Sequence, residues 1–246
     1  MSWRVTSAVA VRVLRQLRRD PRTVALMMVV PPALLALLKY AFDQAPESFQ
    51  RVGVPLVGMF PFLTMFLVTS ITMLRERTTG TLERLMTMPL AKLDLLLGYG
   101  LAFAALAAVQ AAITTAVAFG PLDLHVVGDA YLLVGALAIV NALLGMALGL
   151  FVSAFAQTEF QAVQFMPAFV LPQMLLCGLF VPRDQMAPLL EWISYALPLT
   201  YAYDALNQVA LHGELSGSGA VDALVTVGAA LVALALGAVT LRRRTP

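Results

Sequence analysis

Residues 132–151 have the sequence LLVGALAIVNALLGMALGLF, which contains no charged residue and only one strongly polar side chain, Asn141. A helix of about 20 apolar residues is needed to cross the hydrocarbon core of a bilayer, which is about 30 Å thick. This stretch therefore predicts a membrane-spanning helix.

The rest of the chain has the same character. Of its 246 residues 60% are hydrophobic and 12% are charged, whereas a soluble domain has about 45–50% apolar and about 25% charged residues. So few charges cannot cover a water-exposed surface, and the high hydrophobicity excludes a disordered chain. We predict an all-α integral membrane protein with one transmembrane domain, residues 1–246. The six expected spans are at residues 23–42, 52–74, 93–119, 130–155, 163–181 and 221–241.

The basic residues predict the orientation. Of the 16 Lys and Arg residues, 13 fall in the N-terminal segment, the loop between the second and third spans, or the C-terminal tail. Arg51 and Arg183 fall on the opposite side. Because Lys and Arg concentrate on the cytoplasmic side, we expect a multi-pass protein of the cell membrane with both termini in the cytoplasm.

The first 22 residues predict an amphipathic helix. Val5, Val9, Val13 and Leu17 share one face at helical spacing, and six arginines lie opposite. The Asp20-Pro21 pair ends the pattern, because the residue before proline resists helix. Such a helix lies in the membrane interface with its arginines toward lipid phosphates. It is either an anchor and topology signal or a direct functional contact.

The loop after the second predicted span has the sequence RERTTGTLERLMTMPL, from Arg75 to Leu90. Gly80 permits a turn, and Thr81 can cap a short helix that Pro89 ends. Leu82, Leu85 and Met86 then share one face, which suits docking into a groove of another protein. The alternative is an ordinary solvated loop.

The predicted outer segment at residues 182–220 is long for a loop, and its part from Met186 to Leu206 is apolar. Pro188 and Pro198 interrupt it too often for another crossing. We expect a re-entrant or interfacial helix pair, with aromatic residues at the headgroup level. The residues that mark it are Pro188, Glu191, Trp192, Pro198, Tyr201 and Asp204.

Motifs for chemistry are missing from the chain. Neither lysine follows a glycine, so no P-loop for ATP is present. His125 and His212 stand alone, without ligands at metal-binding spacing, and the spans hold almost no charge that could relay ions. We therefore predict no catalytic, cofactor-binding or metal-binding residue, and an energy source outside this chain.

Small and neutral polar residues lie inside the spans. Gly145 and Gly149 form a Gly-x-x-x-Gly pair, which permits close helix approach within one subunit or between two. Gln110, Asn141 and Gln173 suit hydrogen bonds between helices, or contacts with a substrate.

The six spans, the amphipathic start and the pattern Arg-Glu-Arg-x-x-Gly-Thr-Leu-Glu-x-Leu-x-x-x-Pro together resemble the membrane subunit, or permease, of type 2 ABC exporters, in particular the antibiotic and multidrug branch. The matching residues are Arg75, Glu76, Arg77, Gly80, Thr81, Leu82, Glu83, Leu85 and Pro89. A second match runs from Gly178 to Pro182 and Pro188, and through the Leu197–Tyr201 stretch to Asp204.

This resemblance implies two permease subunits, identical or paralogous, above two separate ABC ATPase subunits that bind ATP and Mg²⁺. The loop around Thr81–Met88 would be the coupling helix, the N-terminal helix would also contact the ATPase, and the segment from Met186 would be a re-entrant pair. The partners implied are ATPase, a second permease and membrane lipid, with no nucleic acid. The expected cargo is drug-like or lipophilic. A polysaccharide, lipid or sodium exporter subunit, or a self-sufficient carrier or channel, is the alternative.

Overall fold

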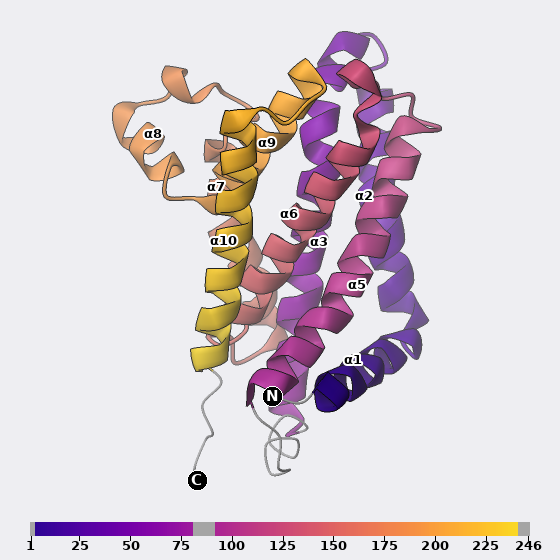
Figure 1. The fold of residues 1–246 in the computed structure, drawn as a ribbon, viewed down its shortest axis with the longest axis vertical. Coiled ribbons are helices and arrows are strands. Elements are labelled where there is room, and N and C mark those ends of the chain that lie inside the picture. The colour runs from indigo at the N-terminus through magenta and orange to yellow at the C-terminus, as the bar shows by residue number, and fades with distance from the viewer. Residues whose placement is uncertain (1–2, 81–91, 241–246) are drawn as a thin grey trace.

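The computed structural model describes residues 3–80 and 92–240, which form a bundle of helices without a strand in these two ranges (Figure 1). Its α-helices are α1 (Trp3–Arg18), α2 (Pro21–Ala41), α3 (Pro46–Thr78), α5 (Lys92–Phe119), α6 (Tyr131–Val152), α7 (Glu159–Leu176), α8 (Pro188–Ser194), α9 (Pro198–His212) and α10 (Gly217–Thr240). Two short 3₁₀ turns, η1 (Val127–Asp129) and η2 (Arg183–Gln185), lie in the connections.

Five helices in the described residues are long and apolar enough to cross a membrane: α2, α3, the Leu97–Phe119 part of α5, α6 and α10. Helix α7 takes the place of the predicted span at residues 163–181. It has only 18 residues, three of them glutamines, and it ends at Leu176. The predicted end at residue 181 is wrong, because Gly178 adopts a φ of 105° and the chain leaves the helix there.

Helix α1 crosses the lower end of the bundle in Figure 1. Its buried residues are Thr6, Val9, Val13 and Leu17, at the spacing that the sequence predicted. Val9 packs so closely against Gly98 of α5 that a Cβ at this glycine would overlap its side chain. The valine face thus packs against α5, a contact that the sequence did not predict.

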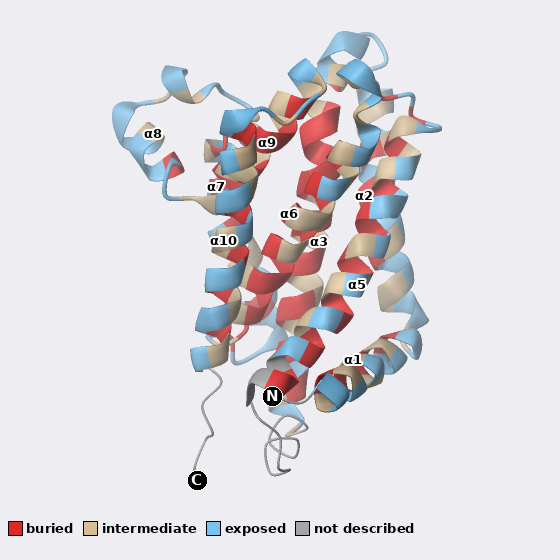
Figure 2. Cartoon of the chain, in the orientation of Figure 1, coloured by how far each residue is buried: buried red, intermediate tan, exposed pale blue. Residues whose placement is uncertain are grey.

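The centre of the bundle is the contact between α3 and α6, where buried residues concentrate (Figure 2). A Cβ at Gly145 would overlap the carbonyl oxygen of Phe62, and one at Gly149 would overlap that of Phe66. The hydroxyl of Thr69 lies 3.2 Å from the carbonyl oxygen of Met146. The Gly-x-x-x-Gly pair therefore serves helix packing within one subunit.

Neutral polar side chains connect other helices. Gln110 of α5 donates a hydrogen bond to the carbonyl oxygen of Met27 of α2, at 2.9 Å. Gln173 donates to Phe169 in its own helix, at 2.9 Å, and accepts from the Leu199 amide at 3.4 Å. Asn141 is buried against α3, and its amide nitrogen has no hydrogen-bond partner among the described residues. Interhelical hydrogen bonding is therefore observed for Gln110 and Gln173.

Candidate functional site

The end of α3 is fastened to α1 by an ion pair whose carboxylate is buried. Glu76 is 3% exposed, and its carboxylate accepts a hydrogen bond from the Arg12 guanidinium at 3.3 Å. A buried carboxylate without a partner would be costly, so Arg12 compensates the burial and holds α1 across the bundle end. Sequence reasoning placed Glu76 in the loop motif and missed this partner, which lies 64 positions away in the chain.

The neighbouring Arg75 connects α3 to α7. Its guanidinium donates two hydrogen bonds to the Glu159 carboxylate, at 2.6 and 2.9 Å. This bidentate geometry is the strongest that Arg and a carboxylate form. Both side chains are about half exposed, so the pair fixes orientation more than it stabilises the fold. Adjacent residues of one helix turn thus bind two different helices, α1 and α7.

The predicted coupling segment begins directly after this junction. The Thr79 hydroxyl donates to the Arg75 carbonyl at 2.8 Å, and Gly80 adopts a φ of +70°. A positive φ of this size favours glycine, in agreement with the predicted turn. Of the predicted coupling residues, the structure describes Arg75, Glu76, Arg77 and Gly80. The remaining residues of the predicted site lie outside the described residues: Thr81, Leu82, Glu83, Leu85, Met86 and Pro89.

A cleft of about 470 Å³ lies between α2 and α3 on the α1 side of the bundle. Its floor is a stripe of α3 at helical spacing, and its walls are mainly apolar residues of α2. Asp20, Thr23 and Arg75 supply polar atoms near α1, and Met166 of α7 reaches its edge. The floor residues are Phe60, Leu63, Thr64, Leu67, Val68, Ile71 and Thr72. The α2–α3 cleft has the size and lining of a small-molecule site.

The other end of the bundle carries the predicted helix pair. Pro188 begins α8 and Pro198 begins α9, as the two prolines indicated. The Thr200 hydroxyl donates to the Ser194 carbonyl, and the Tyr201 hydroxyl donates to the Tyr195 carbonyl, both at 2.7 Å. These bonds connect the end of α8 to the first turn of α9.

Glu191 and Trp192 lie on α8, which stands off to one side of the bundle (Figure 1), whereas Tyr201 and Asp204 lie on α9. Glu191 accepts a hydrogen bond from the Tyr195 hydroxyl at 3.2 Å. Trp192 is 76% exposed, which suits an indole at the membrane surface. α9 continues to His212, beyond the predicted end of the apolar segment at Leu206.

Asp204 of α9 binds Arg183 of η2, with 2.7 Å between the nitrogen and oxygen. Arg183 also lies over the Tyr195 ring, 5.5 Å from its centroid. Burial raises the pKa of Asp204 to about 6, although the Arg183 guanidinium acts in the opposite direction. The sequence singled out Asp204 but not Arg183, which had only been counted as an outer charge. Their contact ties the segment after α7 to α9.

No group of three His, Cys, Asp or Glu side chains in residues 3–80 and 92–240 could hold a metal ion. His125 lies in the connection between α5 and α6, His212 is the last residue of α9, and both are exposed. The ion pairs described above instead join helices or connecting segments to one another.

A helical bundle with several apolar spans and an amphipathic helix across one end indicates an integral membrane protein. Residues 4–211 match the family described as ABC-2 type transporter, and the chain belongs to this family. This confirms the resemblance drawn from the loop and outer motifs.

Two relatives illustrate the range of the family. The chain is 27% identical over 156 residues to "Probable multidrug ABC transporter permease YbhR" of Escherichia coli K12, a match that covers 63% of this chain and 42% of the relative. It is 25% identical over 158 residues to "ABC transporter G family member 20" of Dictyostelium discoideum, which covers 64% of this chain and 22% of the relative. The matched region is thus less than half of either relative.

Proposed function

We propose that this chain is the membrane-spanning subunit of an ATP-driven exporter, which moves a drug-like or lipophilic molecule out of the cell. Family membership supports the transport role, and the printed name of the bacterial relative supports a multidrug cargo. The choice of cargo rests on the α2–α3 cleft. Its apolar walls and polar end suit an amphipathic molecule of drug size.

In this proposal the α1 end faces the cytoplasm and the α9 end faces out across the cell membrane. The basic residues support this orientation, and α1 and the end of α10 lie at the same end of the bundle (Figure 1). Helix α7 would be the sixth span, with Gly178 and the residues after it in the outer interface.

ATP and Mg²⁺ would bind separate ABC ATPase subunits beneath the bundle. Residues 81–88 would dock there as the coupling helix. Two ion pairs would transmit the movement of the coupling helix. Arg12–Glu76 joins the last turns of α3 to α1, and Arg75–Glu159 joins them to α7.

A second permease, either a copy or a paralogue, would cover the face formed by α2 and α7. Helix α7 exposes Gln164 together with apolar residues such as Phe169. An amide facing lipid lacks hydrogen-bond partners, whereas a second subunit can supply them. The α2–α3 cleft borders this face and would lie beside the dimer interface.

The test is ATP-dependent dye uptake by inverted vesicles that contain this chain and its partner ABC ATPase. Leu67→Trp fills the α2–α3 cleft, and Val109→Trp on the exposed face of α5 is the matched control. We expect Leu67→Trp to abolish uptake while the ATPase still co-purifies, and Val109→Trp to transport normally. Full transport by Leu67→Trp would refute the role of the cleft, and transport without ATP or ATPase would favour a self-sufficient carrier.

A further inference from the structure

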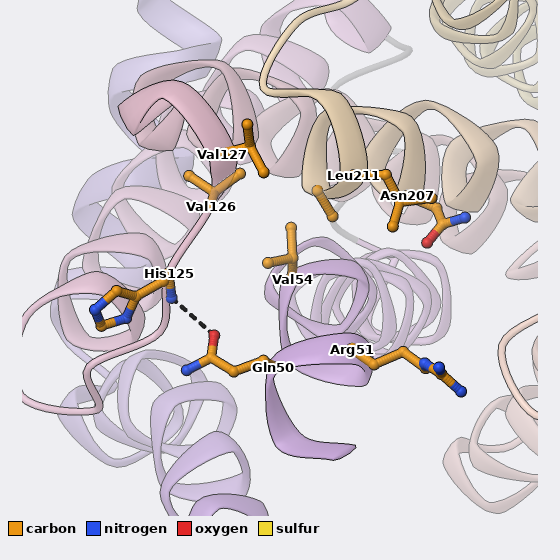
Figure 3. Close-up of a pocket in the computed structure, with 9 residues that line it drawn as sticks. Gln50, Arg51, Val54, His125, Val126, Val127, Asn207 and Leu211 are labelled. Carbon is orange, nitrogen blue, oxygen red and sulfur yellow. Dashed lines mark hydrogen bonds between the residues drawn. The ribbon is translucent and has the colours of Figure 1, made fainter. Parts of the chain in front are cut away.

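A second cavity, of about 630 Å³, lies at the opposite end of the bundle from the α2–α3 cleft. It is open to the surface and is lined by the first turns of α3, the connection between α5 and α6, and the last turns of α9 (Figure 3). We call it the Gln50 cavity. Its lining residues are Gln50, Arg51, Val54, His125, Val126, Val127, Asn207, Ala210 and Leu211.

The walls of the Gln50 cavity are fixed to one another. The Gln50 side chain accepts a hydrogen bond from the His125 amide at 2.9 Å and donates one to the Asp123 carbonyl at 3.1 Å. These bonds fasten the connection between α5 and α6 to α3. Gly213, which ends α9 with a φ of 74°, lies so close to Val127 that a Cβ would overlap the Val127 carbonyl oxygen. The cavity is therefore formed before any ligand binds, which lowers the entropy cost of binding.

Its chemistry is divided between an apolar interior and a basic rim. Val54 is 1% exposed and points toward Leu211 across the space, with Val126 beside them (Figure 3). Arg51 and Asn207 lie on one side of the mouth, and His125 lies on the other (Figure 3). Arg51 is exposed and forms no ion pair with a carboxylate in the described parts of the chain. No acidic side chain lines the cavity, although the Asp123 carboxylate lies 3.9 Å from the His125 ring, whose Nδ1 is 2.7 Å from the Asp123 carbonyl oxygen.

We propose that the Gln50 cavity binds an anionic amphiphile, with a carboxylate or phosphate head on an apolar body. The guanidinium of Arg51 would receive the head in a bidentate contact, with the Asn207 amide beside it. The apolar body would lie between Val54, Val126 and Leu211. This site belongs to one subunit and is separate from the α2–α3 cleft, so it does not rest on the proposed transport function.

The test measures binding of 11-(dansylamino)undecanoate to the full chain in phosphatidylcholine nanodiscs, without ATPase, after subtraction of the signal from empty nanodiscs. Arg51→Gln removes the guanidinium, and Ala210→Phe fills the cavity. Lys39→Gln near the end of α2 is the matched control, because it removes a positive charge outside the lining. The methyl ester of the probe reports the contribution of its carboxylate.

We expect Arg51→Gln to weaken carboxylate binding about tenfold and to leave ester binding within twofold of the wild type. Ala210→Phe should abolish both, and Lys39→Gln should change neither. Equal losses in Arg51→Gln and Lys39→Gln, unchanged binding by Ala210→Phe, or no signal above empty nanodiscs would overturn the proposal. Nanodiscs that also contain phosphatidylglycerol identify the source of the ligand, because competition by this lipid indicates a bilayer headgroup and its absence indicates a free amphiphile.

Discussion

Helices α6 and α7 both pack against α3, yet they do so in different ways. Helix α6 buries 12 of its 22 residues, whereas α7 buries 3 of its 18. Gly145 and Gly149 bring the backbone of α6 against that of α3. Helix α7 carries Pro167 and Pro172 and is joined to the end of α3 by an exposed ion pair.

The difference indicates which part of the bundle is rigid. Two backbones in direct contact cannot shift without a clash, because a close-packed interior has little free space. Large side chains and an exposed ion pair can rearrange at low cost. We therefore infer that α3 and α6 move as one unit, and that α7 is the helix able to change its position during transport.

The largest expected effect tests the rigid contact. Gly149→Leu would place its side chain against the Phe66 carbonyl and the Thr69 hydroxyl. Overpacking lowers stability by about 1–3 kcal/mol where neighbouring side chains can move. The Phe66 backbone cannot move as readily, so the loss should be larger. We therefore expect little folded protein in the membrane. Gly228→Leu is the control, because no atom lies within 4 Å of a Cβ at Gly228. Equal yields of monodisperse protein from both variants would contradict a rigid contact between α3 and α6.

The next effect concerns the ion pair between α1 and α3, in which the Glu76 carboxylate is buried and Arg12 is partly exposed. Arg12→Ala would leave the Glu76 carboxylate buried without its partner, and we expect unfolding to become easier by about 3 kcal/mol. Arg12→Ala with Glu76→Ala removes both charges, so it should cost less than the single arginine variant. Thermal unfolding in detergent measures both. A double variant less stable than Arg12→Ala would show that Glu76 has another role.

Much of this architecture follows from the sequence, because long apolar stretches and prolines act locally. The spans at residues 93–119 and 221–241, the buried valines of α1 and the two prolines that begin α8 and α9 were all visible there. The end of α7 was misplaced because residues 177–181 stay apolar while Gly178 turns the backbone.

Pairings across the chain were not visible in the sequence. Arg75 and Glu159 are 84 positions apart, and nothing local distinguishes Glu159 from a solvated residue. The same holds for Arg12 with Glu76 and for Arg183 with Asp204. A pattern of charges predicts which side of the membrane they occupy, whereas their partners depend on how the helices pack.

A smaller effect concerns the far end of α7, where the following segment is held by Arg183 and Asp204. The pKa of Asp204 is raised to about 6, mainly by burial, with Asp222 also raising it and Arg183 lowering it. As pH falls through about 6, Asp204 takes up a proton in the folded protein, which relieves the cost of burying its charge and weakens the ion pair. Because the pKa is raised, the folded protein binds this proton more tightly than the opened segment does, so the segment is more stable below about pH 6. Hydrogen exchange at residues 177–187, corrected for its intrinsic pH dependence, should therefore be slower at pH 5 than at pH 7.5.

Two variants separate this effect from a general response to acid. Asp204→Asn, which is neutral like the protonated aspartate, should exchange slowly at both pH values, whereas Asp184→Asn, on the exposed side of the same turn, should behave as the wild type. Arg183→Gln removes the group that lowers the pKa of Asp204, so Asp204 should take up its proton at a higher pH than in the wild type. An unchanged pH dependence in Asp204→Asn would assign the effect to another group.

The smallest effect on stability, and the most specific test of the comparison, comes from Glu159→Gln. The Arg75–Glu159 pair is about half exposed, and exposed pairs contribute about 0–1 kcal/mol, so the unfolding temperature should barely change. If this pair nevertheless links the end of α3 to α7, its loss should increase the distance fluctuations between spin labels at positions 79 and 160 in a Cys177→Ser background. Labels at positions 79 and 7 report the α1 contact as the control, and they should not change. Unchanged fluctuations between positions 79 and 160 would mean that packing alone holds α7 against α3, and that α7 belongs to the same rigid unit as α6.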